Sequence, residues 1–193
     1  MPEEATIVEL GSWWSFYSMW FCSKVKKPHA YMVEPDLGRL EFGKKNFALN
    51  GFKGEFFNYF LGLKSGFWKE TKRSILKGTY EVETKTRVIC VDDFIEQNKI
   101  KFIDILHADI QGAEVDMLTG AAKALRDRKI KYFVLSTHSN QLHVDCINLL
   151  KASNYLILCE ADVTQAMHVD GFLVARAAEM PGPSSISIDK LSH

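Results

Sequence analysis

Short apolar runs alternate along this chain with segments whose apolar residues recur at helical spacing. The apolar runs predict strands at 6–10, 30–33, 54–60, 102–108, 132–136, 155–159 and 172–175. The periodic segments predict helices at 12–23, 36–48, 114–128 and 142–152, with a short helix opening at 92–94. Strands that alternate with helices are typical of an α/β protein whose sheet carries helices on both faces.

The last two predicted strands are joined differently from the others. Their connector, residues 160–171, has no helical pattern, and strands joined without a crossover helix usually run antiparallel. We therefore predict a doubly wound, mostly parallel sheet of seven strands with an antiparallel terminal strand.

The segment 12–23 is apolar nearly all round, which predicts a well-buried helix. Tyr17 and Trp20 are expected in its core-facing part. Trp13 or Trp14, at the start of the helix, is placed to cover a pocket at the sheet edge.

Two further segments carry no strand–helix alternation. Residues 64–77 are polar and basic and predict a mobile excursion, whereas the alternating residues 79–91 predict a hairpin or an extended pair. After Ala178 the periodic pattern ends. This predicts a single domain over residues 1–178, followed by a flexible tail over residues 179–193.

Charge and cysteine content narrow the function classes. Lys plus Arg equals Asp plus Glu, so the formal net charge is zero and no global field attracts nucleic acid or an anionic membrane. No apolar run is long enough to span a bilayer. The four cysteines form no CxxC pair, so reduced thiols in a cytoplasmic protein are a better interpretation than a zinc site.

A carboxylate, Asp109, follows directly after the predicted strand 102–108 and precedes a turn and a helix. In open α/β sheets, ligands bind just beyond the carboxyl ends of the strands. Asp109 is therefore a candidate for chemistry rather than for packing.

Two earlier strand ends also carry acidic residues, in Glu9-Leu10-Gly11 and at Glu34. In a nucleoside-binding fold, a glycine after the first strand lets the backbone approach the ligand. An acidic residue that ends the second strand accepts hydrogen bonds from the ribose hydroxyls. Trp13 and Ser15 stand where further glycines would be expected, which argues for a ligand without a pyrophosphate. The alternative is that Glu9 and Glu34 are merely exposed residues at strand ends. The occurrence of both, at this spacing, favours a ligand site.

Four blocks of the sequence carry a resemblance to a known family. They are Val8-Glu9-Leu10-Gly11, Val33-Glu34-Pro35, Val91-Asp92-Asp93-Phe94 and Ile103-Asp104-Ile105-Leu106-His107-Ala108-Asp109-Ile110-Gln111-Gly112-Ala113-Glu114. In this order the chain resembles the FkbM-type methyltransferases over residues 6–176. The resemblance implies a Rossmann-like fold, S-adenosylmethionine as the cofactor with S-adenosylhomocysteine as its product, and O-methylation.

The resemblance also implies roles for the matching positions. The methionine end of the cofactor would lie along Glu9, Gly11, Ser12 and Trp13, and the ribose beside Glu34 and Pro35. Asp92 or Asp93 would lie near the adenine, and Asp109 beside the transferred methyl group.

The chain departs from the family pattern at three places. The family usually has Lys where His107 stands, Glu where Gln111 stands, and a carboxylate where this chain has Ser136-Thr137-His138. Family members also tend to carry more chain before the first strand, so the sequence is interpreted as a trimmed or minimal domain.

His138 is the first choice for the base that removes a hydroxyl proton from the acceptor. It follows the strand expected beside the one that bears Asp109, and the ordinary pKa of histidine suits the task. The alternative is an ordinary polar residue at a strand end. His107 lies inside an apolar strand and is interpreted as a hydrogen-bonded core histidine.

A metal ion is a further alternative. Asp109, Glu114 and His138 are weak candidates for ligands of a divalent ion, and nothing in their spacing requires one. A carboxylate at the start of a helix, such as Glu114, is explained by the helix dipole alone.

These observations favour an O-methyltransferase that acts on a hydroxyl of a sugar, a glycan or a secondary metabolite. An RNA methyltransferase would be expected to present a lysine near Asp109 and a basic groove. The third alternative is a non-catalytic domain that binds the cofactor or a partner. The segments that would select the acceptor, 62–78 and 160–170, carry no recognisable motif.

Overall fold

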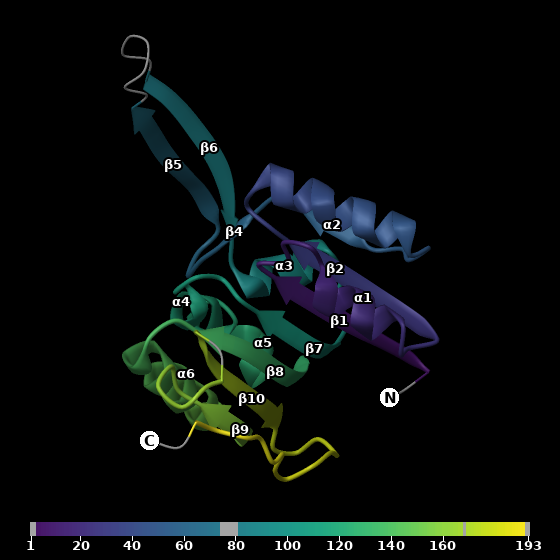
Figure 1. The fold of residues 1–193 in the computed structure, drawn as a ribbon, viewed down its shortest axis with the longest axis vertical. Helices are drawn as coiled ribbons and strands as arrows, with labels where there is room; N and C mark the ends of the chain where they lie inside the picture. Colours follow the sequence, from purple (N-terminus) through teal and green to yellow (C-terminus); the bar gives the residue numbers. More distant parts are fainter. Residues whose placement is uncertain (1–2, 74–80, 168, 192–193) are drawn as a thin grey trace.

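The computed structural model describes residues 3–73, 81–167 and 169–191. Within them, seven strands form one sheet in the order β3-β2-β1-β7-β8-β10-β9 (Figure 1). The strands are β1 (Glu4–Leu10), β2 (Lys27–Val33), β3 (Glu55–Phe57), β7 (Ile103–Ala108), β8 (Ile130–Thr137), β9 (Tyr155–Ala161) and β10 (Gly171–Ala177). All neighbours run parallel except β10, which is antiparallel to both β8 and β9. The predicted sheet is confirmed, and its reversed strand lies one position in from the edge.

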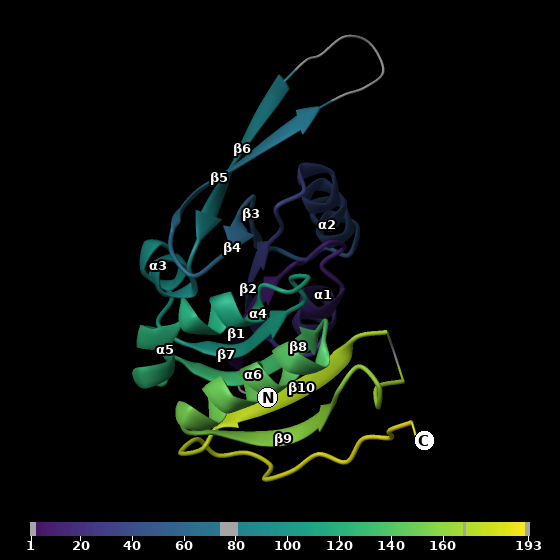
Figure 2. The same cartoon turned by 90° about the vertical axis from the view of Figure 1, so that its left-hand side faces the viewer.

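Helices cover both faces of this sheet (Figure 2). One face carries α1 (Phe16–Cys22) and α2 (Leu37–Leu49), and the other carries α3 (Val91–Gln97), α4 (Glu114–Thr119), α5 (Ala122–Arg126) and α6 (Asn140–Ala152). Alternate residues of a strand point to opposite faces. Ile7 therefore packs with Phe21 and Phe47, whereas Val8 packs in the core that contains Phe94 and Met117.

The helix predicted over 114–128 is two helices, α4 and α5. The break leaves backbone N–H groups at the start of α5 without partners inside the helix. The two carboxylate oxygens of Asp92 accept from Lys123 N and Ala124 N, each at 2.8 Å. Asp92 thus caps α5 and ties it to α3.

A long hairpin projects from the body of the domain (Figures 1 and 2). It consists of β5 (Gly66–Arg73) and β6 (Glu81–Ile89), which pair antiparallel. The short β4 (Phe60–Leu61) pairs with the base of β6, so these three strands form a second sheet.

The hairpin changes two of the sequence predictions. The extended pair expected at 79–91 is confirmed for 81–89, but the mobile excursion is wrong for 66–73, because this stretch has β6 as its pairing partner. Residues 74–77 and 79–80 lie outside the described residues. The strand predicted at 54–60 is divided into β3 and β4.

The first helix is shorter and more exposed than predicted. Its expected first turn is irregular, since Trp13 and Ser15 adopt left-handed backbone conformations with φ of 36° and 59°. Only Ser18, Phe21 and Cys22 of the helix are buried, and Trp20 is 51% exposed. The large side chains with exposed fractions near one half are Trp13, Trp14, Phe16, Tyr17 and Trp20. The prediction of a well-buried helix with Tyr17 and Trp20 in the core is wrong, because only one side of this short helix contacts the sheet.

The segment after β10 covers the part of the sheet that α1 leaves open. Ile186 N donates to Leu158 O at 2.9 Å, and Ile188 packs against the cluster of Leu158, Cys159 and Val174. As far as residue 191 the segment forms no helix or strand. It takes the place that a further helix would occupy on this face.

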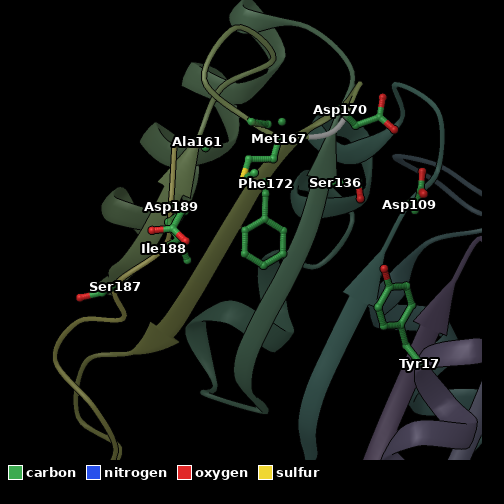
Figure 3. A pocket seen from close by; sticks show the side chains of 12 residues that line it. Tyr17, Asp109, Ser136, Ala161, Met167, Asp170, Phe172, Ser187, Ile188 and Asp189 are labelled. Atoms are coloured by element: carbon green, nitrogen blue, oxygen red, sulfur yellow. The ribbon is translucent and has the colours of Figure 1, made fainter. Parts of the chain in front are cut away.

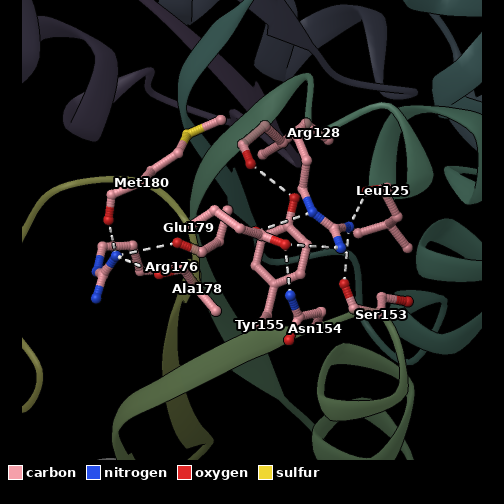
Figure 4. Close-up of polar contacts among 11 residues, drawn as sticks. Leu125, Arg128, Ser153, Asn154, Tyr155, Arg176, Ala178, Glu179 and Met180 are labelled. Carbon is pink, nitrogen blue, oxygen red and sulfur yellow. Dashed lines mark hydrogen bonds and ion pairs between the residues drawn. The ribbon is translucent and has the colours of Figure 1, made fainter.

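Polar contacts fix the beginning of this segment (Figure 4). Arg128 donates from Nε to Glu179 Oε2 at 3.1 Å and from Nη1 to Ser153 O at 2.9 Å. The guanidinium of Arg176 donates to the carbonyl oxygens of Ala177 and Met180. These contacts attach residues 176–180 to the domain, and the flexible tail over residues 179–193 stays a prediction.

The four cysteines, Cys22, Cys90, Cys146 and Cys159, are free and buried. No disulfide joins them, which agrees with the reduced thiols expected from the sequence. In the described part of the chain, no helix combines the length and apolar character that crossing a membrane requires.

The carboxyl ends of β1 and β7 approach each other closely. Asp109 N donates to Leu10 O at 3.0 Å. Gly11 has a φ of +74°, and a Cβ atom at this position would lie 1.9 Å from the carbonyl oxygen of Asp109. Glycine permits this approach because it has no side chain and tolerates positive φ. The loops after the two strands can therefore lie side by side.

We expect Gly11→Ala to lower the free energy of unfolding by at least about 2 kcal/mol, because the methyl group collides with the Asp109 backbone. Gly66→Ala is the matched control, since a Cβ there meets nothing within 4 Å. It should change stability by less than about 0.5 kcal/mol. Urea denaturation followed by circular dichroism measures both variants, and equal stabilities would contradict the need for glycine at position 11.

Candidate active site

Two cavities open at the sheet edge where β1, β2, β7 and β8 end. The Glu34 cavity, of about 240 Å³, is lined by Gly11, Glu34, Pro35, Arg39 and Gln111 among others. The Ser136 cavity, of about 580 Å³, is lined by Tyr17, Ser136, Asp170, Phe172 and Asp189 among others (Figure 3). Asp109 lines both cavities.

Glu34 is held firmly in the wall of its cavity. Its carboxylate accepts from Trp13 N and from Asp36 N, both at 3.0 Å, and the residue is only 3% exposed. A carboxylate has about four lone-pair sites, so these bonds leave capacity for a ligand. The Arg39 guanidinium lies 4.5 Å above the Trp13 ring and covers the rim. The structure therefore brings Gly11, Trp13, Glu34 and Pro35 together.

Glu9 lies behind the two cavities rather than in either wall. It is 2% exposed, and its Oε2 accepts from Ser18 N at 2.9 Å, in the first turns of α1. Burial raises the pKa of Glu9 to about 7. In this structure Glu9 supports the start of α1.

The two aspartates expected near the adenine lie away from the Glu34 cavity. Asp92 uses both oxygens to cap α5 and lines a separate hollow with Ile95 and Lys123. Asp93 accepts a hydrogen bond from the Ser65 hydroxyl. Neither carboxylate lines the Glu34 cavity.

Four polar side chains meet at the ends of β7 and β8. Gln111 Nε2 lies 3.0 Å from Asp109 Oδ1 and 2.9 Å from His138 Nε2. His138 Nε2 is 3.2 Å from Asp109 Oδ1, and its Nδ1 is 3.1 Å from Glu114 Oε1. The structure thus brings together Asp109 and His138, the two residues predicted to be catalytic.

Glu114 is fully buried at the first position of α4. Its Oε1 accepts from Ile110 N at 3.2 Å and from Gly112 N at 3.3 Å, which fixes the loop after β7. Its Oε2 is buried without a hydrogen-bond partner, as is His138 Nδ1. The contact between Glu114 Oε1 and His138 Nδ1 is therefore a close approach without the geometry of a hydrogen bond.

The three metal candidates lie together but do not converge. Asp109 approaches Nε2 of the His138 ring and Glu114 approaches Nδ1, so their carboxylates lie on opposite sides of the imidazole. Among the residues that the structure describes, no group of three or more His, Cys, Asp or Glu is arranged to hold a metal ion.

His107 and Tyr17 form a layer below the Ser136 cavity. Their ring centroids are 4.1 Å apart, and the ring planes are tilted by 31°. His107 is 5% exposed, and burial lowers its pKa to about 4. The core location predicted for His107 is confirmed, but its Nδ1 has no hydrogen-bond partner.

Tyr17 is a site residue that the sequence prediction missed. Figure 3 shows its hydroxyl pointing toward the end of β7, where Asp109 lies. Burial raises the pKa of Tyr17, and the charges of Asp109 and Glu9 raise it further. Because α1 begins at Phe16 instead of residue 12, Tyr17 faces the sheet edge. The apolar pattern of the sequence did not indicate this later start.

Asp170 and Asp189 also line the Ser136 cavity without having been predicted. Asp170 directly precedes β10, so a reversed strand delivers it to the edge where the parallel strands end. The position of Asp170 follows from the prediction that the last strand is antiparallel. Asp189 belongs to the segment predicted as a tail, which carried no such signal.

Backbone strain is concentrated in the two loops at the site. Positive φ at Lys99, Arg128 and Asn154 occurs directly after helix ends, where it is common. Trp13, Ser15 and Gln111, with φ of 36°, 59° and 54°, lie instead in the loops after β1 and β7. Such conformations in residues other than glycine often mark functional sites.

Several solved structures that share this fold are described as methyltransferases. The FkbM methyltransferase of Methylobacillus flagellatus KT has a TM-score of 0.63 and 19% identity, over 90% of this chain and 44% of its own. TrmK of M. capricolum, solved with S-adenosyl-homocysteine, has a TM-score of 0.55 and 15% identity, over 92% of this chain and 64% of its own. Precorrin-6y C5,15-methyltransferase of Geobacter metallireducens GS-15 has a TM-score of 0.58 and 10% identity, over 91% of this chain and 81% of its own.

Fold and site together define a Rossmann-like domain of the methyltransferase class. Residues 8–157 match the family described as the methyltransferase FkbM domain, and the chain belongs to this family. It spans less than two thirds of the length of the first two solved structures. No curated protein matches it.

The raised pKa of Glu9 predicts a pH-dependent effect of Glu9→Gln. The carboxyl binds its proton more tightly in the folded than in the unfolded chain. Its stabilising contribution is therefore complete below pH 4.5 and is lost as the pH rises to about 7. The stability of Glu9→Gln relative to the unchanged chain should rise across this window, by on the order of 3 kcal/mol.

Urea denaturation at several pH values measures this difference. His107, whose lowered pKa acts in the opposite direction, is common to both chains and cancels in the comparison. The exposed Glu96 supplies the control, and Glu96→Gln should show no such trend. A pH-independent difference for Glu9→Gln would mean that Glu9 is not abnormally protonated.

Proposed function

We propose that this chain is an S-adenosylmethionine-dependent O-methyltransferase, with the cofactor in the Glu34 cavity and a hydroxyl acceptor in the Ser136 cavity. The observation that carries the proposal is the position of Asp109, which lines both cavities at the end of β7. A methyl group passing from one ligand to the other would cross beside this carboxylate. Membership of the FkbM family supports the reaction class.

The residues around the Glu34 cavity fit the cofactor. The nearly buried carboxylate of Glu34 can accept hydrogen bonds from ribose hydroxyls. The Ser12 hydroxyl is buried in the loop after β1 and has no hydrogen-bond partner. A buried polar atom without a partner is costly, so it favours a ligand group that would pair with it. Ser12 and Trp13 would then lie toward the methionine end.

The bound cofactor would supply an electrophilic methyl group, whose bond electrons return to sulfur as the acceptor oxygen forms the new bond. The chain holds the acceptor and removes its proton. His138 takes this proton at Nε2, the ring nitrogen that faces Asp109. Asp109 and Asp170, at 3.2 and 3.6 Å from this nitrogen, stabilise the positive charge that the ring gains.

The Ser136 cavity supports an acceptor without phosphate groups. Among the described residues that line it, Asp109, Asp170 and Asp189 are acidic and none is Lys or Arg. A wall of this charge repels a polyanion such as RNA and accepts a neutral polyol. A sugar, a glycan or a hydroxylated secondary metabolite fits this condition. The four free cysteines support a reducing, cytoplasmic location.

Calorimetry with S-adenosylhomocysteine tests the cofactor site. The unchanged chain should bind it, and Glu34→Gln should weaken binding about 10-fold or more, because a charged acceptor is lost. Glu55→Gln is the matched control on the neighbouring β3, where the side chain is exposed, and should leave affinity unchanged. If the unchanged chain does not bind S-adenosylhomocysteine at millimolar concentration, the proposal is wrong.

Transfer of labelled methyl groups to a panel of neutral glycans and to tRNA tests the reaction. Asp109→Asn and His138→Ala should each lower kcat by about 100-fold or more, with S-adenosylhomocysteine affinity changed less than about 3-fold. An active double variant would remove both residues from the mechanism. Label in tRNA would favour an RNA enzyme, and cofactor binding without any transfer would favour a non-catalytic domain.

A further inference from the structure

The side chain of Gln111 lies between the two groups that the proposed reaction needs. Its amide nitrogen is 3.0 Å from Asp109 Oδ1 and 2.9 Å from His138 Nε2. The inference drawn from this contact rests on the proposed function, because it concerns how His138 is kept ready to accept a proton.

The orientation of the Gln111 amide follows from the charge of Asp109. An amide nitrogen carries two hydrogens and accepts none, whereas a carboxylate only accepts. Rotating the amide to place its oxygen against Asp109 would bring two acceptors together and is unfavourable. One N–H of Gln111 therefore points to Asp109, and the other points to His138 Nε2.

A neutral histidine has one protonated ring nitrogen and one lone pair. Because Gln111 donates to Nε2, the lone pair is on Nε2 and the proton is on Nδ1. Glu114 favours the same form, since its Oε1 lies 3.1 Å from Nδ1 and its carboxylate is fully buried. Gln111 and Glu114 thus select the same tautomer. They do so against Asp109 and Asp170, whose carboxylates lie 3.2 and 3.6 Å from Nε2 and favour a proton there.

The backbone holds Gln111 in this place at a cost. Its φ of 54° is left-handed, a conformation that is unfavourable for a residue other than glycine. Glu114 stabilises the loop by accepting from the N–H groups of Ile110 and Gly112. The loop therefore directs the Gln111 amide toward the end of β8.

We propose that Gln111 is a positioning residue that fixes neutral His138 as the tautomer with its proton on Nδ1 and its lone pair on Nε2. The lone pair faces Asp109, at the boundary of the two cavities. When Nε2 takes the acceptor's proton, the Gln111 N–H must turn away, and the charged ring then interacts with Asp109 and Asp170.

Nitrogen-15 NMR of the histidine rings in the full-length chain tests this at pH 8.5 without any acceptor. Signals of His138 are assigned by their loss in His138→Ala, since the chain has six histidines. We expect the form protonated on Nδ1 to predominate. In Gln111→Ala the ratio of the two tautomers should fall at least about 5-fold, as expected for loss of one hydrogen bond.

Gln111→Glu reverses the hydrogen-bonding character of the side chain while keeping its shape, so Nε2 should become protonated. Gln141→Ala is the matched control, because Gln141 is an exposed glutamine at the start of α6 that bonds to Asp145. It should leave the His138 tautomer unchanged. Gln111→Ala should also lower kcat by about 10- to 100-fold.

A ring protonated on Nε2 or on both nitrogens in the unchanged chain would overturn the proposal, as would an unaltered tautomer ratio in Gln111→Ala. The predicted tautomer combined with no methyl transfer to any acceptor would count against the proposed function alone. The two ideas can therefore fail separately.

Discussion

The close approach of β1 and β7 at their carboxyl ends is the constraint on which the site depends. Gly11 meets the Asp109 carbonyl in a space that admits no side chain. This contact brings the loop after β1, which bears Ser12 and Trp13, beside the loop after β7, which bears Gln111. The Glu34 cavity lies between them, and Asp109 marks the passage to the Ser136 cavity.

Behind these loops the domain buries polar groups that set their positions. Glu9 supports the start of α1, and Glu114 supports the loop after β7. His107 stays neutral under the Tyr17 ring because burial lowers its pKa. Buried polar groups of this kind reduce stability, and such costs are typically found where a site must be held rigidly.

Much of the fold could be predicted from the sequence because apolar periodicity reports burial. The parallel strands and the reversed β10 follow from local patterns. The first helix could not be predicted correctly, since its aromatic residues have the same pattern whether they face a core or solvent. The hairpin strand β5 was missed because its pairing partner lies further along the chain.

The positions of Glu34, Asp109 and His138 could be predicted, because each residue ends or follows a strand, whereas their roles stay predictions. The position of Asp92 could not be predicted. It caps α5, and the apolar pattern of the sequence does not show the break between α4 and α5 that makes this cap possible. The role of Gln111 was equally hidden. In the sequence it is a departure from the family pattern, and so is His138; in the structure the two departures contact each other at 2.9 Å.

A crystal structure of the chain with S-adenosylhomocysteine tests the central claim most directly. We expect the ribose hydroxyls within hydrogen-bond distance of the Glu34 carboxylate and the sulfur atom directed toward Asp109 and the Ser136 cavity. A ligand bound away from Glu34, or one whose sulfur points away from Asp109, would contradict the assignment of the two cavities.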